Sequence, residues 1–305
     1  MGHLEILLIA IILDAVFGEP DWIWKRIPHP IEVTGNCIRW FDDTLNTGSF
    51  QKIKGFVVTG ILVLGAGILG WILTKLPDFG LIEIIVVAVL LAHKSLVQHV
   101  MNVAVALAQD ITLGRLEVAK IVGRTTDQLQ PSDVTRAAIE SAAENFSDGV
   151  IAPALWYLVF GLPGILIYKA INTADSMIGY KTEKHSDFGY PAAKLDDILN
   201  WVPARFTSLI ICLTHKPRAS FDIVLDDASL HRSPNAGWPE AAMAAVLGIA
   251  LAGPRSYDGQ KVDYPYVNAQ ARHQLDPEDI RRSVSTLNIV WTGFALVLFL
   301  GILVF

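Results

Sequence analysis

The sequence has few cysteines, few charges and no excess of basic residues. Its 305 residues include two cysteines, Cys37 and Cys212, too few for a disulfide framework or a cysteine-based zinc site. Charged residues make up 18% of the chain and the net charge is −6, so the basic surface typical of nucleic-acid binding is missing. Walker A, H-E-x-x-H and G-x-S-x-G patterns are also absent, which argues against the nucleotide-binding and hydrolase classes that carry them.

Hydrophobic residues, by contrast, make up 52% of the chain. A helix needs about 20 apolar residues to cross a hydrocarbon core. Four apolar runs approach or reach that length: residues 55–74, 149–168, 283–305 and, interrupted by ionisable side chains, 79 to about 105. These runs predict an all-α, polytopic integral membrane protein with about five to seven membrane-embedded helices. We expect a single integrated domain over residues 1–305.

Short apolar runs and the charge of the loops both complicate the expected membrane topology. Three further apolar runs are too short to span comfortably: residues 6–16, 206–213 and 241–253. Polar loops are expected at about 14–54, 106–148, 169–205 and 214–240. Nearly all of these loops are basic, and short basic loops stay in the cytoplasm, so strict alternation across the bilayer conflicts with the charge pattern. Some short segments are therefore expected to be re-entrant, and Gly161-Leu-Pro-Gly164 would suit such a turn if protein surrounds it.

One glycine pattern imitates a nucleotide motif. Gly65-Ala-Gly67-Ile-Leu-Gly70 matches G-x-G-x-x-G, but a dinucleotide fingerprint needs a strand before it and a helix after it. Here the pattern lies inside a continuous apolar run. Small residues that allow close helix packing explain it better.

The strongest local signal lies in residues 135–149. Helical geometry places Arg136, Glu140, Glu144 and Asp148 at successive i,i+4 positions, with Asn145 alongside. Small apolar residues cover the rest of this helix, and the acidic stripe leads directly into an apolar run of membrane length. Carboxylates at a membrane boundary are costly unless they are paired, hydrated or metal-bound. We therefore interpret the stripe as functional rather than as a solvated face.

A second element resembles the end of that stripe. Asn145-Phe-Ser-Asp148 is echoed by Asn172-Thr-Ala-Asp175, and each Asn/Asp pair lies on one helical face beside an apolar stretch. Mg²⁺ takes one or two carboxylates together with phosphate oxygens and water. The two aspartates are therefore candidate magnesium ligands.

Further candidates lie in the later polar loops and in two proline-rich turns. Lys194, Asp196 and Asp197 precede Arg205, which stands at the start of an apolar run and suits bidentate capture of phosphate or carboxylate. The turns Pro28-His29-Pro30 and His231-Arg232-Ser-Pro-Asn235 are rigid and display groups typical of ligand loops. An isolated histidine is as often structural as functional.

Together these stretches resemble one family, the adenosylcobinamide-phosphate synthases of cobalamin biosynthesis. The matching residues occur in order from Asp14 to Glu240, far beyond any single motif. They are Asp14…Gly18-Glu19-Pro20, Pro28-His29-Pro30, Arg136-Ala-Ala-Ile-Glu140-Ser-Ala-Ala-Glu144-Asn145, Asp148-Gly-Val-Ile-Ala-Pro153, Asn172-Thr-Ala-Asp175-Ser-Met-Ile-Gly179-Tyr180, Asp187-Phe-Gly189, Leu195-Asp196-Asp197, Pro203-Ala-Arg205 and His231-Arg232-Ser-Pro-Asn235-Ala-Gly-Trp-Pro-Glu240.

The resemblance implies an ATP-dependent, amide-forming ligase in the cytoplasmic membrane of a prokaryote, with its active loops facing the cytoplasm. It would join a propionate of adenosylcobyric acid to the amine of (R)-1-amino-2-propanol phosphate, giving adenosylcobinamide phosphate. Mg²⁺ and ATP are the expected cofactor and co-substrate. Expected partners are the corrinoid, the aminoalcohol phosphate, the lipid bilayer and later membrane enzymes of the pathway, without nucleic acid.

Roles for the candidates follow from this chemistry as hypotheses. Asp148 and Asp175 would hold the metal. Catalytic groups, including a base that deprotonates the amine, would come from Glu140, Glu144, His29 and His231. Phosphate and substrate binding would fall to Arg136, Asn145, Asn172, Lys194, Asp196, Asp197, Arg205, Arg232 and Asn235.

Several alternatives stay open at this level. The carboxylate could be activated as an acyl phosphate or as an adenylate, and threonine phosphate could replace aminopropanol phosphate. A magnesium-dependent membrane phosphotransferase or prenyltransferase is a rival enzyme class, although Pro153 and Phe146 stand where those motifs need Arg and Asp. A transport or signalling relative is the rival outside enzymes, and intramembrane charges would suit a transport path.

Overall fold

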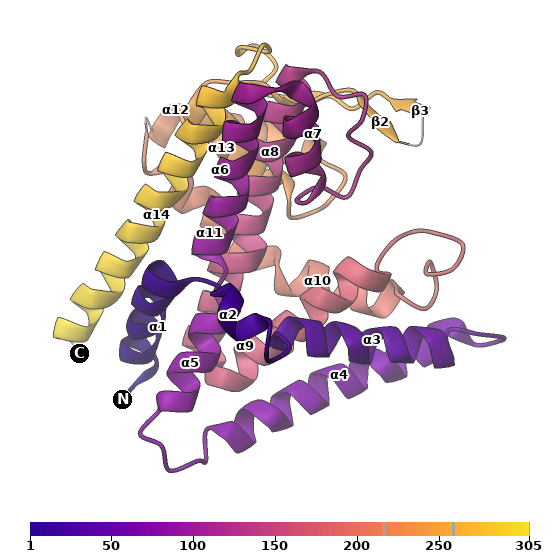
Figure 1. The fold of residues 1–305 in the computed structure, drawn as a ribbon, viewed down its shortest axis with the longest axis vertical. Helices are drawn as coiled ribbons and strands as arrows, with labels where there is room; N and C mark the ends of the chain where they lie inside the picture. The colour runs from indigo at the N-terminus through magenta and orange to yellow at the C-terminus, as the bar shows by residue number, and fades with distance from the viewer. Residues whose placement is uncertain (216, 258–259, 305) are drawn as a thin grey trace. The chain divides into compact units, whose positions relative to one another are not determined.

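The computed structural model describes residues 1–215, 217–257 and 260–304, and helices dominate it, which confirms the all-α prediction (Figure 1). In chain order the elements are α1 (His3–Phe17), α2 (Asp21–Trp24), α3 (Pro30–Leu45), α4 (Gln51–Leu73), α5 (Leu81–Leu90), α6 (His93–Gln109), α7 (Ile111–Ala119), α8 (Pro131–Phe146), the π-helical segment η1 (Ser147–Ile151), α9 (Ala152–Ile178), α10 (Tyr190–Leu199), α11 (Trp201–Cys212), α12 (Pro217–Asp227), the 3₁₀ turn η2 (Ala228–Leu230), α13 (Gly237–Leu247), four short strands β1 (Leu251–Ala252), β2 (Arg255–Tyr257), β3 (Gln260–Val262) and β4 (Tyr266–Val267), and α14 (Pro277–Val304).

The chain packs into two compact units, each built from segments distant in sequence. Unit 1 comprises Met1–Ala92, Asp148–Trp201 and the residues from Leu298 onward. Unit 2 comprises His93–Ser147 and Val202–Val297. Because the chain passes repeatedly from one unit to the other, neither is a sequence domain, and the single integrated domain stays a prediction.

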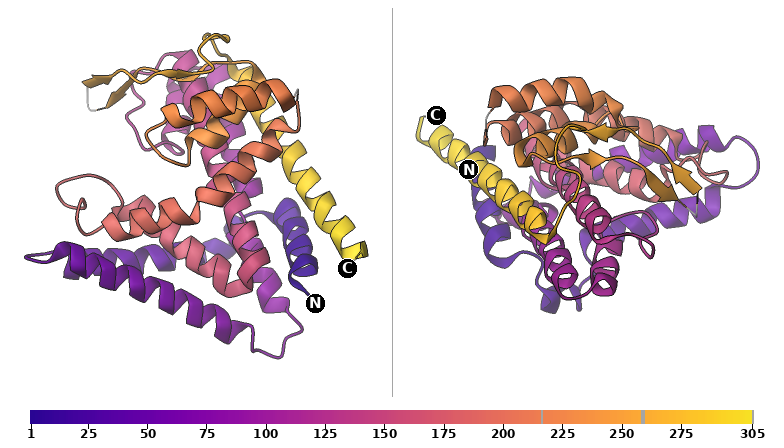
Figure 2. Two further views of the ribbon diagram at one scale, coloured as in Figure 1. Left: turned by 180° about the vertical axis from the view of Figure 1, so that it is seen from behind. Right: turned by 90° about the horizontal axis from the view of Figure 1, so that it is seen from above.

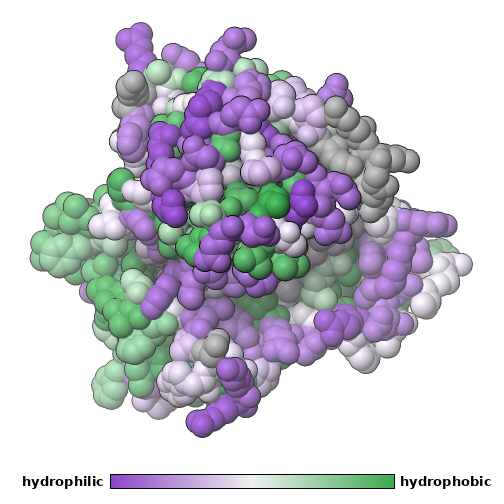
Figure 3. Space-filling model, turned by 45° about the horizontal axis from the view of Figure 1, so that its top comes forward, coloured by the Kyte–Doolittle hydropathy of each residue, from purple (hydrophilic) through white to green (hydrophobic). Residues whose placement is uncertain are grey.

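Helix length and composition agree with a membrane protein. Among the described residues, four helical stretches could cross a bilayer: Gln51–Leu73, Leu81–Gln109, Pro131–Ile178 and Pro277–Val304. Each contains most of one predicted apolar run, and α11 adds a shorter apolar helix. Phe305, the last residue of the fourth run, lies outside the described residues. Large side chains of α4 such as Phe56 and Leu64 are exposed, and Figure 3 shows extended hydrophobic areas in green on the surface, as contact with lipid requires.

The third apolar stretch is a hairpin rather than one straight helix. Gly161 breaks α9 with φ 63° and ψ −152°, a conformation that glycine tolerates, and Pro163 begins the returning half. The Tyr168 hydroxyl lies 2.8 Å from the carbonyl oxygen of Asp148. In a straight helix these two residues would be about 30 Å apart. The turn expected at residues 161–164 is therefore confirmed.

In unit 1 the returning half of α9 packs with α3, α4 and α10 (Figures 1 and 2). Its core is apolar and includes Ile38, Phe41, Val58, Ile171 and Phe188. The loop after α9 is fixed to α3 by Asp42, which accepts hydrogen bonds from Lys184 Nζ at 2.6 Å and Asn46 Nδ2 at 2.8 Å. These bonds hold the pKa of Asp42 below its usual value, although burial opposes them. The sequence analysis did not identify this anchor.

One glycine of the pattern in α4, Gly70, serves close packing, as expected. A Cβ atom at Gly70 would lie 2.6 Å from both the nitrogen and the Cα of Pro163. The backbone of α4 therefore touches the turn of the α9 hairpin at this point. Gly65, earlier on the same helix, would meet no atom within 4 Å.

These two glycines give a matched stability test. Gly70→Ala is expected to destabilise unit 1 by about 1–3 kcal/mol, because backbone atoms of the turn must move away from the added methyl group. Gly65→Ala is expected to be neutral or to stabilise by about 0.5–1 kcal/mol, because alanine favours a helix interior. Thermal unfolding of both variants in detergent measures the difference. Equal Tm values for the two variants would contradict the close approach.

Unit 2 surrounds α8. Helices α6 and α7 pack with one another and with α8, while α13 contacts α8, α12 and β1. Strands β1 and β4 form an antiparallel pair, with Leu251 opposite Val267 and Ala252 opposite Tyr266. The short apolar run 241–253 becomes buried helix and strand in this unit, where Ala241, Ala242 and Met243 have no exposed surface.

Candidate functional site

The predicted site residues divide between the two units. Unit 1 contains His29, Asp148, Asn172, Asp175, Lys194, Asp196 and Asp197, and unit 2 contains Arg136, Glu140, Glu144, Asn145, Arg205, His231, Arg232 and Asn235. Each group is described on its own.

In unit 1 the carboxylates gather around the hairpin. Asp148 lies in the π-helical segment η1, a local widening of the helix that is frequent at functional sites. The Tyr168 hydroxyl lies 2.8 Å from two acceptors, the Asp148 carbonyl and Asn200 Oδ1, so its proton ties the two halves of the hairpin to the end of α10. The negative charges of Asp148, Asp175 and Asp196 all interact electrostatically with this hydroxyl. Both predicted metal ligands therefore lie in one electrostatic environment.

Asp196 is the most perturbed carboxyl group of this cluster. It is 8% exposed and accepts hydrogen bonds from Asn172 Nδ2 at 3.2 Å and from Asn200 Nδ2 at 2.9 Å. Burial raises the pKa of Asp196 from 3.8 to about 6, against the opposing effect of the two amides. The structure thus brings together Asn172 and Asp196, which the sequence analysis had selected separately.

The donor set fits a magnesium ion held largely by substrate. Among the described residues, no group of three or more His, Cys, Asp or Glu side chains gathers closely enough to hold a metal ion. A protein cage for calcium or zinc would need such a group. Magnesium bound to ATP needs only one or two carboxylates. Asp148 and Asp175 remain suitable for that role.

His29 has a structural role at the start of a helix. It is the N-cap of α3, where its Nδ1 accepts a hydrogen bond from the Ile31 amide at 3.2 Å. Burial lowers the pKa of His29, although Glu19 opposes this, so the ring is neutral at pH 7. A neutral ring whose Nδ1 accepts must carry its proton on Nε2. In this geometry Nε2 of His29 is a hydrogen-bond donor, and the catalytic role of His29 stays a prediction.

Lys194 and Asp197, both on α10, form an ion pair. Lys194 Nζ lies 2.8 Å from Asp197 Oδ2, one turn away on α10, and the hydrogen bond raises the pKa of Lys194. The lysine side chain is largely exposed, so the pair adds little to stability. A phosphate could replace Asp197 as its partner, and the binding role stays a prediction.

In unit 2, Arg136 and Glu140 of α8 bind different partners. Arg136 donates to the carbonyls of Ala250 and His273 and to Asp133, at 3.3, 2.7 and 2.8 Å. Glu140 accepts from the Ala252 amide at 2.7 Å and from Arg124 at 3.3 Å. Both side chains are buried and bind backbone of the segment around β1. They hold α8 to that segment.

The next residues of the α8 stripe lie closer to the surface. Asn145 is exposed, and its amide donates to Ser141 O at 2.9 Å and Ser141 Oγ at 3.0 Å. Glu144 is half-buried. The predicted roles of these two residues stay predictions.

His231 also has both ring nitrogens engaged. Its Nδ1 accepts from the Ser233 amide at 3.0 Å, and its Nε2 faces Glu240 Oε1 at 3.6 Å. Because Nδ1 accepts, Nε2 is the nitrogen that can donate toward this buried carboxylate. His231 therefore joins the loop before α13 to α13 itself, and its catalytic role stays a prediction.

The loop 231–240 contacts a second predicted residue. Arg205 of α11 donates to Asn235 Oδ1 at 3.3 Å, and its guanidinium stacks 4.5 Å from the centre of the Trp238 ring. Arg232 lines a small cavity with Leu230, His231 and Tyr264. Four predicted residues of unit 2 are therefore neighbours, and they are candidates for substrate binding at one loop: Arg205, His231, Arg232 and Asn235.

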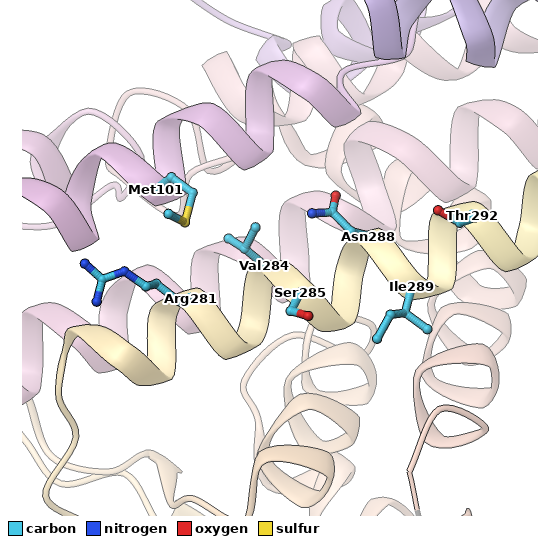
Figure 4. Close-up of a pocket in the computed structure, with 7 residues that line it drawn as sticks. All are labelled: Met101, Arg281, Val284, Ser285, Asn288, Ile289 and Thr292. Carbon is cyan, nitrogen blue, oxygen red and sulfur yellow. The ribbon is translucent and has the colours of Figure 1, made fainter.

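A cavity of unit 2 is lined by none of the predicted residues. It is an open groove of about 560 Å³ between α6 and α14, lined by Met101, Arg281, Val284, Ser285, Asn288, Ile289 and Thr292 (Figure 4). Most of these side chains come from one face of a helix long enough to cross a membrane. The groove lacks the carboxylates that the predicted chemistry needs.

Sequence reasoning missed three side chains of unit 1: Trp24, Tyr168 and Lys169. The signal for Lys169 was present, since an ionisable residue at the end of an apolar run is a functional candidate. The charges of Glu19 and Asp148 both act on Lys169. Tyr168 and Trp24 carry no such signal, because an aromatic residue in an apolar stretch is usually core.

Fold and site together define a polytopic helical membrane protein with buried carboxylates and amides around a broken helix. The profile of the CobD/Cbib protein family matches residues 7–287. The chain therefore belongs to that family, a family of cobalamin biosynthesis, as the sequence resemblance indicated.

Relatives named "Cobalamin biosynthesis protein CobD" match over nearly the whole chain. The protein of Rhizobium meliloti is 48% identical over 299 residues, covering 92% of this chain and 91% of its own. Those of Brucella suis biovar 1 and Rhodobacter capsulatus are 44% and 39% identical, covering 96% and 98% of this chain and 94% and 97% of their own. No solved structure matches the fold.

Proposed function

We propose that the protein is an ATP-dependent amide ligase of cobalamin biosynthesis. It would join a propionate of adenosylcobyric acid to (R)-1-amino-2-propanol phosphate and release adenosylcobinamide phosphate. Family membership supports the pathway. The observation that carries the chemistry is the cluster around Tyr168, whose hydroxyl joins the two arms of the hairpin and interacts electrostatically with Asp148, Asp175 and Asp196.

The proposed reaction has two steps, and both balance. The carboxylate attacks the γ-phosphorus of ATP, which gives an acyl phosphate and ADP. The amine then attacks the acyl carbon, loses a proton and expels inorganic phosphate. Magnesium, when bound with ATP, would neutralise phosphate oxygens, and Asp148 and Asp175 are the residues suited to hold it.

Asp196 is the base that this geometry favours. A general base works best when its pKa lies near the working pH, and burial brings the pKa of Asp196 to about 6. Asn172 and Asn200 fix the orientation of its carboxylate by donating to separate oxygens. In both predicted histidines Nδ1 already accepts a backbone amide, which favours Asp196 over them for this role.

We propose the cytoplasmic face of the cell membrane as the location of these groups. Lys181, Lys184 and Lys194 lie in the segment beside Asp196. Basic segments next to membrane helices remain on the cytoplasmic side. ATP and the corrinoid are also supplied from there.

The proposal is tested with protein purified in detergent and relipidated. Adenosylcobyric acid, aminopropanol phosphate and MgATP are supplied together, and each is omitted in turn. Mass spectrometry of the corrinoid is expected to show an amide-linked product only in the complete mixture. A folded protein that gives no product under these conditions would contradict the ligase and favour a transport or signalling role.

A further inference from the structure

Two buried N–H groups of unit 1 have no hydrogen-bond partner among the described residues. They are the indole Nε1 of Trp24, at the end of α2, and the imidazole Nε2 of His29, at the start of α3. The two rings touch edge to face, with centroids 4.5 Å apart. A buried donor without a partner costs about 1–3 kcal/mol, so two of them side by side need an explanation.

The protonation of both groups is fixed. An indole nitrogen can only donate. His29 Nδ1 accepts from the Ile31 amide, so the neutral ring has its proton on Nε2. The Val89 backbone interacts with the His29 ring as a weak acceptor and favours its protonated form, but it does not give Nε2 a partner with hydrogen-bond geometry. Both groups therefore present hydrogen, and what they lack is an acceptor.

The side chain of Lys169 adds a positive charge near these two donors. The charge of Lys169, on the returning half of the α9 hairpin, acts on the His29 ring. Glu19 acts on both His29 and Lys169, and Glu32 acts on His29, but both carboxylates are exposed and therefore screened by water. Asp148, the proposed metal ligand, acts on the same lysine. Two neutral donors and one ammonium thus lie in the neighbourhood of the proposed reaction site.

We propose that Trp24, His29 and Lys169 form an oxyanion site that binds a phosphate group of a substrate. This inference deepens the proposed function and rests on it for the identity of that substrate. The phosphate could belong to the aminoalcohol phosphate or to ATP, since both present the same oxygens. Donors of this kind bind phosphate through short, charge-assisted hydrogen bonds. A metal ion is the wrong occupant, because none of the three groups offers it a lone pair.

The test measures binding rather than turnover. Titration calorimetry on the full chain in detergent would use aminopropanol phosphate in one arm and the magnesium complex of a non-hydrolysable ATP analogue in the other. Lys169→Met and Trp24→Phe remove one donor each while keeping side-chain bulk. Lys75→Met and Trp22→Phe are matched controls, since both residues of unit 1 are exposed and lie outside the proposed site.

Lys169→Met is expected to raise the Kd of one of the two phosphates by about tenfold or more, with Lys169→Arg recovering most of the loss. Trp24→Phe is expected to raise the same Kd by about three- to tenfold, because it removes one neutral hydrogen bond. The controls are expected to bind as the unchanged protein does. The arm that responds identifies the source of the phosphate.

Two results would overturn the inference, and each leaves a different conclusion about the ligase. Unchanged affinities in both arms, in variants whose Tm matches the unchanged protein, would contradict the oxyanion site alone, and the ligase would stand if product still forms. A protein that binds neither phosphate and forms no product would contradict both proposals.

Discussion

Asp196→Asn is expected to lower kcat for amide formation by about 10²–10⁴, the range that a general base contributes. Asparagine keeps the shape of the side chain and can still bond to Asn172 and Asn200, but it cannot take a proton from the amine. The unchanged enzyme should lose activity as the pH falls through the pKa of Asp196, about 6. Asn200→Ala should move this acid limb to higher pH, because the Asn200 amide lowers the pKa of Asp196.

Asp196→Asn is also expected to raise the thermal stability of the protein. The pKa of Asp196 is about 6 in the folded protein and 3.8 without its surroundings. A carboxyl group whose pKa is raised by folding makes stability fall as the pH rises from 3.8 through 6, after which the cost stays constant. Asparagine carries no such cost. The Tm gain of Asp196→Asn should therefore grow as the pH rises from 3.8 through about 6 and stay constant at higher pH.

The measurement combines pH-rate profiles with thermal unfolding of the same samples. Asp43→Asn is the matched control, since Asp43 is exposed on α3 of the same unit. It should change neither the profile nor the pH dependence of Tm. Full activity of Asp196→Asn at pH 7.5 would rule out Asp196 as the base.

Asp148→Asn is expected to raise the magnesium concentration needed for half-maximal activity by about 10–100-fold, a loss that even supporting residues of metal sites can cause. The substitution removes one of two carboxylates proposed to hold the ion, and magnesium prefers charged oxygen ligands. Asp175→Asn should behave in the same way. Excess magnesium should restore much of the rate in either variant.

This recovery separates a ligand from a structural residue. Asp148 lies in the π-helical segment, and its carbonyl is bonded to Tyr168, so damage to the hairpin could also reduce activity. Damage of that kind would lower the rate at every magnesium concentration. A rate that is reduced but independent of magnesium would therefore contradict the metal assignment, as would full activity at limiting magnesium.

Much of the fold could be predicted because its signals are local. The apolar runs define the long helices, and Gly161 with Pro163 marks the turn of the hairpin. Asn172 and Asp175 share a helical face, so their proximity follows from spacing alone. Asn172 and Asp196 meet across α9 and α10, which no spacing could show.

Contacts with distant backbone could not be predicted from the sequence. Arg136 and Glu140 have the spacing of an ion pair, yet they bind carbonyl and amide groups more than 110 residues away. His29 and His231 look like bases in the sequence. An amide two residues further along the chain occupies Nδ1 in each, and that contact depends on backbone geometry rather than on residue type.

The most direct test of the ligase uses adenosylcobyric acid labelled with ¹⁸O in its reacting carboxylate. The account predicts one amide product per ATP consumed, with ADP and with one ¹⁸O in each inorganic phosphate released. Label in AMP would show activation as an adenylate instead. ATP consumed without amide and without transfer of label, or no ATP consumed at all by the folded protein, would contradict the account.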